Sequence, residues 1–93
     1  MADKLKLLIL NASSEERRTI RATLEYLNVF EFIEAADSLD ALTLLKKQPV
    51  NMIITGLSVG KIDGWRFSRM IRSGLLKTPK NTPILLIPPI YCE

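Results

Sequence analysis

Histidine is absent from this 93-residue sequence, and cysteine occurs once, as Cys92 near the C-terminal end. Without imidazole groups the chain has neither histidine-based metal sites nor histidine-dependent catalysis, which excludes much of the usual enzyme repertoire. A single thiol forms no disulfide within the chain, so we expect a protein of the reducing cytoplasm. For Cys92 itself we favour a plain terminal thiol over a crosslink between two chains.

Long apolar runs and dense positive charge are missing as well. No run approaches the about 20 residues that span a bilayer, and the N-terminal Met-Ala-Asp-Lys lacks the pattern of a signal peptide. The formal net charge is +3, and the basic residues are scattered. Arg17, Arg18 and Arg21 share one predicted helix. We interpret them as a solvated helix face, with binding of an acidic partner as the alternative.

What the sequence does contain is typical of one small soluble domain covering residues 1–93. Its apolar fraction of 47% and charged fraction of 25% are ordinary for a globular protein. At this length the core is modest and the stability marginal.

Strand and helix patterns alternate along the whole chain. Apolar and β-branched runs predict strands over residues 5–10, 30–35, 52–55 and 83–87. The alternation predicts an α/β fold with a parallel sheet, right-handed crossovers and helices on both faces. Because the connecting helices are short, we expect the flavodoxin-like strand order 2-1-3-4. The second strand carries glutamates, which suits a position at or near an edge.

Three helices are expected between the strands. The first begins near Ser13, which forms a capping box with Glu16, and it stops at Asn28. Ser38 is the expected cap of the second helix, and the third covers residues 64–72. The apolar residues expected to face the sheet are Ile20, Leu24 and Leu27 in the first helix, Leu39, Leu42 and Leu45 in the second, and Trp65, Phe67, Met70 and Ile71 in the third.

The loop after the third strand lies where ligands bind in open α/β sheets, outside the carboxyl ends of the strands. At that strand end stands Gly56, which has no side chain. Asp63 closes the loop, and we interpret it as the cap of the third helix and not as a metal ligand, because it has no acidic partner. Ser58 and Thr55 carry hydroxyls nearby, but no base stands beside either one to make it a nucleophile.

Four segments together resemble the receiver domain of bacterial response regulators. They cover residues 8–13 (LILNAS), 33–42 (IEAADSLDAL), 53–65 (from IITG to DGW) and 82–87 (TPILLI). The segments stand in the family's order and at its spacing, and the resemblance covers essentially the whole chain. It implies the receiver-type variant of the flavodoxin-like fold.

The resemblance also locates the family's functional positions. Receiver domains accept a phosphoryl group on an aspartate at the end of the third strand, beside Mg²⁺ held by acidic residues after the first. In this sequence the acidic pair falls on Asn11 and Ala12, the phosphoacceptor on Gly56, the hydroxyl residue on Pro88 and the next position on Pro89. The family's lysine falls beyond residue 93. We therefore expect a degenerate, inactive site that holds no metal and no cofactor.

Receiver domains continue after the fourth strand with a helix, a strand and a helix. Ile84, Leu85, Leu86 and Ile87 are therefore expected to form an exposed apolar sheet edge, the candidate interaction edge, and one sheet face is expected to lack the cover of a final helix. Both features favour a homodimer or a constitutive protein partner. A fragment of a longer chain is the alternative that the sequence leaves open.

The resulting hypothesis is a non-phosphorylatable receiver-like module, not an enzyme, that acts through constitutive protein–protein interaction or self-association in two-component signal transduction. One alternative is a small flavodoxin-like nucleotide-binding or enzymatic domain, against which stand the missing histidine and the lack of a glycine-rich phosphate loop. Another is weak nucleic-acid binding through Arg17, Arg18 and Arg21, which we rank last. We expect no small-molecule substrate and no membrane contact.

Overall fold

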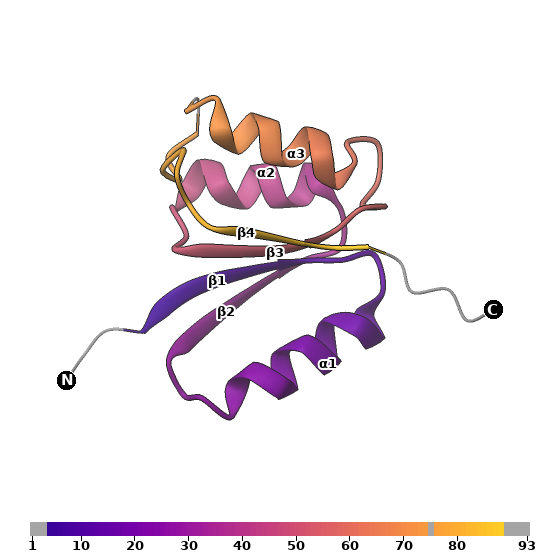
Figure 1. Ribbon diagram of the computed structural model, residues 1–93, viewed down its shortest axis with the longest axis vertical. Coiled ribbons are helices and arrows are strands. Elements are labelled where there is room, and N and C mark those ends of the chain that lie inside the picture. The colour runs from indigo at the N-terminus through magenta and orange to yellow at the C-terminus, as the bar shows by residue number, and fades with distance from the viewer. Residues whose placement is uncertain (1–3, 75, 89–93) are drawn as a thin grey trace.

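Strands and helices alternate without interruption in the computed structural model, which describes residues 4–74 and 76–88 (Figure 1). The elements are β1 (Leu5–Leu10), α1 (Ser14–Glu25), β2 (Phe30–Ala35), α2 (Ser38–Lys47), β3 (Met52–Gly56), α3 (Gly64–Arg72) and β4 (Ile84–Ile87). All strand pairs are parallel, and the order across the sheet is β2-β1-β3-β4. The predicted fold, strand order and edge position of β2 are therefore confirmed.

The helices divide unequally between the two faces of the sheet. Figure 1 shows α2 and α3 together on one face and α1 alone on the other. No helix within the described part of the chain has the length and apolar character needed to cross a membrane.

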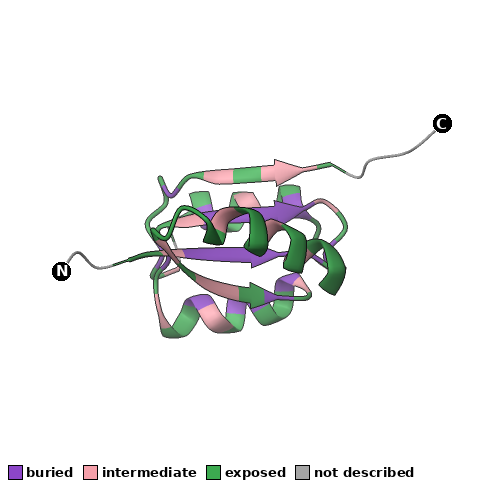
Figure 2. Cartoon of the chain, turned by 90° about the horizontal axis from the view of Figure 1, so that it is seen from below, coloured by how far each residue is buried: buried purple, intermediate pink, exposed green. Residues whose placement is uncertain are grey.

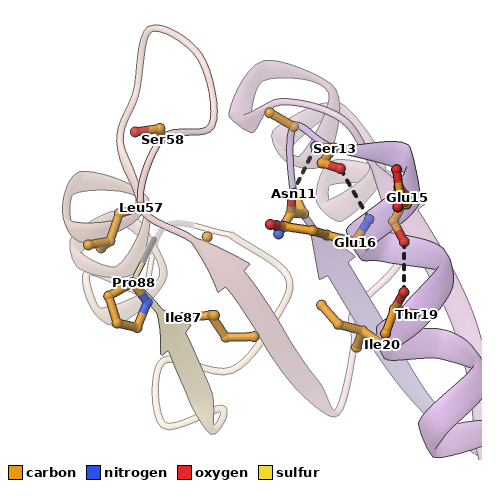
Figure 3. A pocket seen from close by; sticks show the side chains of 12 residues that line it. Asn11, Ser13, Glu15, Glu16, Thr19, Ile20, Leu57, Ser58, Ile87 and Pro88 are labelled. Carbon is orange, nitrogen blue, oxygen red and sulfur yellow. Dashed lines mark hydrogen bonds between the residues drawn. The ribbon is translucent and has the colours of Figure 1, made fainter. Parts of the chain in front are cut away.

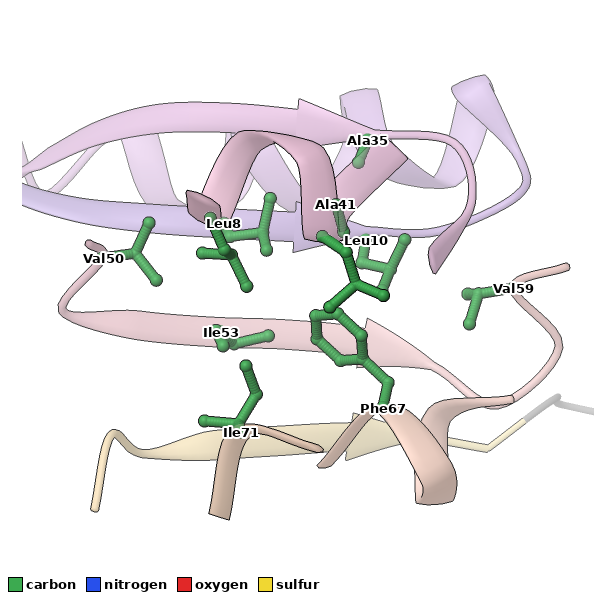
Figure 4. Close-up of a cluster of buried hydrophobic side chains, with 11 residues drawn as sticks. Leu8, Leu10, Ala35, Ala41, Val50, Ile53, Val59, Phe67 and Ile71 are labelled. Carbon is green, nitrogen blue, oxygen red and sulfur yellow. The ribbon is translucent and has the colours of Figure 1, made fainter. Parts of the chain in front are cut away.

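The face under α2 and α3 holds the main core (Figure 4). Its buried side chains come from the sheet, from both helices and from the loops before and after β3: Leu8, Leu10, Ala35, Ala41, Leu42, Leu45, Val50, Ile53, Val59, Phe67 and Ile71. The central strands read as nearly continuous apolar runs because β1 and β3 are covered on both sides. Phe67 and Ile71, one turn apart on α3, bring the helix onto the sheet.

The face under α1 holds a smaller cluster. Leu7, Ile9 and Ile54 are buried there, but α1 itself contributes no buried residue. Its apolar residues Ile20 and Leu24 are only half-buried. Figure 2 shows the result, with the central strands buried and most of α1 exposed.

Two of the three predicted N-terminal helix caps are confirmed, and α1 ends at Glu25 with Tyr26 as its C-cap, shortly before the predicted stop at Asn28. The Ser13 side chain accepts a hydrogen bond from the Glu16 backbone N–H at 3.1 Å, and Asp63 accepts one from Arg66 at 2.9 Å. Asn28 adopts the left-handed conformation with φ of 53°. The predicted Ser38 cap is wrong.

Asp37 caps α2, accepting from the backbone N–H of Asp40 at 2.9 Å, and Ser38 is the first helical residue. The Ser38 backbone N–H donates instead to the carbonyl of Val59 at 2.7 Å. That contact draws Ser38 into the core, where its hydroxyl is buried and has no partner among the described residues.

Four residues expected to pack inward are exposed. Leu27 is 55% exposed, because α1 ends before it, at Glu25. Leu39 is 51% exposed, because Ala41, Leu42 and Leu45 form the face of α2 that meets the sheet. Trp65 is 61% exposed and Met70 lies at the surface, because Phe67 and Ile71 occupy the inner face of α3. Boundaries shift slightly as well: β3 extends to Gly56, and β4 begins at Ile84, after Pro83.

Candidate functional site

A cavity of about 630 Å³ opens at the carboxyl ends of β1, β3 and β4. It is lined by Asn11, Ala12, Ser13, Glu15, Glu16, Thr19, Ile20, Gly56, Leu57, Ser58, Ile87 and Pro88. Figure 3 shows two walls: the end of β1 and the first turns of α1 on one side, the ends of β3 and β4 on the other. Four of the five positions that the resemblance singled out, Asn11, Ala12, Gly56 and Pro88, line this one cavity, and the fifth, Pro89, falls outside the described residues.

Asn11 is held in place by its own turn. Its side-chain oxygen accepts a hydrogen bond from the Ser13 backbone N–H at 2.8 Å. Its backbone N–H donates to the carbonyl of Ala35 at 3.1 Å, and its carbonyl accepts from the Arg17 guanidinium. In the predicted capping box the Glu16 side chain would accept a hydrogen bond from the Ser13 backbone N–H. In the structure the Asn11 side-chain oxygen accepts that bond instead. The Asn11 side chain therefore stabilises the turn that leads from β1 into α1.

Gly56 is buried at the end of β3, yet the space beside it admits a Cβ atom. A Cβ atom at this position would lie 3.5 Å from the Asn11 side-chain nitrogen and 3.8 Å from a methyl group of Val59, both ordinary contacts. Gly64 differs, since a Cβ atom there would collide with the carbonyl oxygen of Gly56. The close approach of α3 to the end of β3 therefore requires glycine at 64, whereas nothing steric requires it at 56.

The loop from β3 to α3 is fixed by Val59, whose side chain is fully buried in the main core. Gly60 follows with φ of 98°, a conformation that favours glycine. This anchoring leaves Ser58 exposed at the cavity wall. Thr55 does not reach the cavity: it is fully buried, and its hydroxyl donates to the Gly56 carbonyl at 2.9 Å.

The charged groups of the cavity are Glu15 and Glu16, in the first turn of α1, and no lysine or arginine lines it. Sequence reasoning missed both glutamates as cavity residues. The signal was present, because the first turn of a helix that follows a strand end directly must lie beside that end. Within the described residues no group of three or more His, Cys, Asp or Glu side chains could hold a metal ion.

Two of the three α1 arginines are engaged with β2. The Arg17 Nε atom lies 3.2 Å from one carboxylate oxygen of Glu34, and Arg21 Nη1 lies 2.9 Å from the other. The hydrogen bond from Arg21, assisted by Arg17, lowers the pKa of Glu34 against the opposing effect of burial. Arg21 also lies over the Phe32 ring, 5.4 Å from its centroid.

The expectation that all three arginines form a solvated face is therefore wrong for Arg17, whose side chain is only 16% exposed. Arg18 is exposed. The guanidiniums of Arg17 and Arg21 are both paired with the Glu34 carboxylate, although Arg21 remains 44% exposed, and this pairing weakens the case for a nucleic-acid surface on α1.

The candidate interaction edge Ile84–Ile87 is the last strand of the described sheet and pairs with β3. Ile84 packs against the main core, while Ile87 packs against the smaller cluster under α1. Leu85 is 51% exposed, and Leu86 is half-buried. Pro88 lies at the cavity wall, whereas Pro89 and Cys92 fall outside the described residues.

Comparisons with known proteins agree with this architecture. No family model matches the sequence, and no curated protein matches it. Solved structures do match, among them the receiver domain of the Francisella response regulator 1452, with a TM-score of 0.80 and 19% sequence identity. The chemotaxis response regulator CheY4 of Vibrio cholerae matches with a TM-score of 0.76 and 28% identity. The receiver domain of the sensor histidine kinase PA1611 of Pseudomonas aeruginosa, which has a magnesium ion coordinated in its active site cleft, matches with a TM-score of 0.77 and 20% identity.

The matches cover 96%, 89% and 89% of this chain and 69%, 67% and 66% of those chains, in the same order. This chain thus spans about two thirds of their length. It has the fold of a response regulator receiver domain, as the resemblance of its sequence implied.

Proposed function

We propose that this chain is a receiver-like signalling module that works without phosphorylation, through constitutive contacts with other proteins in two-component signal transduction. The observation that carries the proposal is the composition of the strand ends at the cavity. Asn11, Ala12 and Gly56 stand there, and none of them has a carboxylate.

Phosphoryl transfer to a receiver needs a carboxylate nucleophile and carboxylate ligands for Mg²⁺. Gly56 offers no nucleophile, and the Asn11 side-chain oxygen is already occupied by the Ser13 N–H. The carboxylates that remain, Glu15 and Glu16, are exposed and lie on the α1 wall. These residues do not fit a receiver-type magnesium site.

A module without the phosphoryl switch has no ligand-dependent shift between two states at this site. The anchoring of the β3–α3 loop by Val59 and by the bond between Ser38 and Val59 supports a single, preformed surface. For the contact itself we propose the outer edge of β4, Ile84–Ile87. As the outermost described strand it presents backbone donors and acceptors on the side away from β3, and a second copy of the chain is the expected partner there.

The experiment that tests the loss of phosphorylation is intact-mass measurement after incubation with Mg²⁺ and a small acyl phosphate. We expect the mass of the chain to stay unchanged, whereas a gain of one phosphoryl group contradicts the proposal.

A matched variant shows whether the missing carboxylates explain the result. Asn11→Asp, Ala12→Asp and Gly56→Asp together place three carboxylates at the cavity, and a Cβ atom at position 56 would make only ordinary contacts. We expect saturable Mg²⁺ binding by calorimetry for this variant and none for the natural chain. Saturable binding by the natural chain would mean that Glu15 and Glu16 suffice for a metal site.

A further inference from the structure

Positive charge and an exposed indole ring meet on the outer side of α3. We propose that this surface binds a single-stranded nucleic acid, with a base stacked on Trp65 and phosphates beside Arg66 and Arg69. The activity is separate from the protein contacts proposed above, because it uses neither the cavity at the strand ends nor the edge of β4.

Charge is divided unevenly along the chain. Residues 41–88 contain eight lysines and arginines against one carboxylate, that of Asp63, whereas residues 4–40 contain five against seven. Asp63 is already used as the cap of α3, where it accepts from the Arg66 backbone N–H at 2.9 Å. The later residues form most of α2 and all of β3, α3 and β4. The part of the molecule around α3 therefore has the uncompensated positive charge that attracts a polyanion.

The outer side of α3 holds the residues that would make the contact. Phe67 and Ile71 face the core, so Trp65, Arg66 and Arg69 are exposed. Trp65 and Arg69 stand one helical turn apart and share a face. Among the described residues neither Arg66 nor Arg69 has an ion pair. Both guanidiniums are therefore available to phosphates.

The segment that follows α3 holds a further cation in place. Arg72 Nη1 donates to the carbonyls of Lys80 and Thr82, at 2.7 Å and 2.6 Å. The stem of Lys80 lies against the end of α3, since a Cβ atom at Gly74 would be 3.8 Å from Lys80 Cδ. The position of Lys80 beside the helix is thus set by the fold.

The end of α2 adds two more cations. Each helix leads into a strand, α2 into β3 and α3 into β4, and these strands are parallel neighbours. The C-terminal ends of both helices therefore lie at the same end of the sheet, on the left in Figure 1. Lys46 and Lys47 are exposed there. Cations spread over several elements suit a chain of phosphates better than a single anion.

Trp65 decides between the two kinds of polyanion that such a surface attracts. An exposed aromatic ring among arginines is a stacking platform for an unpaired base. An acidic protein segment would need an apolar patch around the ring to exclude water, yet Arg66 and Arg69 flank Trp65. Met70, the other exposed apolar residue of α3, is five positions away and points to another side of the helix. A single-stranded nucleic acid is therefore the favoured occupant.

The test uses the fluorescence of Trp65, which is the only tryptophan of the chain. The probe is a single-stranded oligothymidylate of about 12 nucleotides, added to the whole 93-residue chain. We expect saturable quenching of the Trp65 emission and an affinity that falls steeply as the salt concentration rises. Absence of saturable binding at low salt overturns the proposal.

Two other polyanions check the choice of occupant. Polyglutamate of the same charge should bind about tenfold or more weakly and should leave the emission unquenched, because it has no base to stack. Equal or tighter binding of polyglutamate would assign the surface to an acidic protein and overturn the proposal. Equal binding of a duplex of the same length would overturn it as well, since the bases of a duplex are not free to stack on Trp65.

A pair of arginine variants locates the phosphate contact. Arg69→Gln should weaken binding of the oligonucleotide about fivefold or more and lower the slope of log affinity against log salt by about 0.7. Arg18→Gln is the matched control, because Arg18 is also an exposed helical arginine but belongs to α1, on the other face. Equal loss in both variants would mean that only net charge matters, which contradicts a site on α3.

A pair of aromatic variants tests the stacking. Trp65→Ala should weaken binding about fivefold or more, measured by anisotropy of a labelled oligonucleotide. Tyr26→Ala is the matched control, because Tyr26 is 90% exposed at the end of α1. Both side chains are exposed, so both variants should fold, which circular dichroism checks. Unchanged affinity in folded Trp65→Ala overturns the stacking and with it the proposal.

Discussion

The two faces of the sheet are covered in different ways. On the α2 and α3 side, two helices and the β3–α3 loop bury a continuous apolar cluster, with Phe67, Leu45 and Val59 fully enclosed. On the other side, α1 buries none of its residues and touches the sheet through half-buried Ile20 and Leu24.

The attachments differ in kind as well as in extent. The attachment of α1 adds ion pairs to its apolar contacts, because Arg17 and Arg21 both reach Glu34 on β2. Such exposed pairs contribute little, about 0–1 kcal/mol each. The α2 and α3 face therefore holds most of the buried core, whereas the α1 face leaves its apolar side chains only partly covered.

The largest expected effect is on the well-covered face. Phe67→Ala removes the largest fully buried side chain and leaves a cavity beneath α3. We expect the free energy of unfolding to fall by about 3–5 kcal/mol, measured by denaturant titration. In a domain of this size such a loss approaches the whole stability. A loss below about 1 kcal/mol would mean that α3 is not part of the core.

The matched truncation on the other face is Leu24→Ala. Leu24 is half-buried under α1, so less apolar area returns to water and the surroundings can relax. The same titration should show a loss of about 1–2 kcal/mol, clearly smaller than for Phe67→Ala. Equal losses in the two variants would remove the difference between the faces.

The smallest expected effect concerns the electrostatic hold on α1. Glu34→Gln removes the carboxylate shared by Arg17 and Arg21 and should cost below about 1 kcal/mol at neutral pH. Because the pKa of Glu34 is lowered in the fold, its contribution is fully present above the ordinary value of 4.5 and is lost as the pH falls through the lowered value. Below that pH the natural chain should therefore be no more stable toward unfolding than the Glu34→Gln variant.

Hydrogen exchange shows where this loss occurs. In Glu34→Gln the backbone amides of α1 should exchange faster, while those of α3 keep their protection. Faster exchange of α3 would show that the Glu34 pairs support the whole fold and not the attachment of α1.

Much of the fold could be predicted because its signals are local. The apolar run from Leu7 to Leu10 and the branched residues before Gly56 define two central strands by themselves, and Asp63 caps α3 as its position suggests. Asp37 and Ser38 show the limit. Both can cap a helix, and the choice falls to Asp37 because a distant carbonyl, that of Val59, takes the Ser38 N–H.

Part of the candidate site could also be predicted, in this case from the resemblance to receiver domains. The resemblance brought Asn11, Ala12, Gly56 and Pro88 to one cavity, and the structure places them there. The pairing of Arg17 and Arg21 with Glu34 was not predictable, since it depends on how α1 crosses β2 and not on residue spacing. The presence of Glu15 and Glu16 beside the cavity could have been inferred, because the first turn of α1 directly follows the end of β1.

The central claim is that the chain associates constitutively, without a phosphoryl switch. Light scattering of the 93-residue chain over a concentration series, with and without Mg²⁺ and an acyl phosphate, tests it most directly. We predict the mass of a dimer that the phosphoryl donor leaves unchanged. A monomer mass at every concentration, or a mass that shifts when the donor is added, would contradict the account.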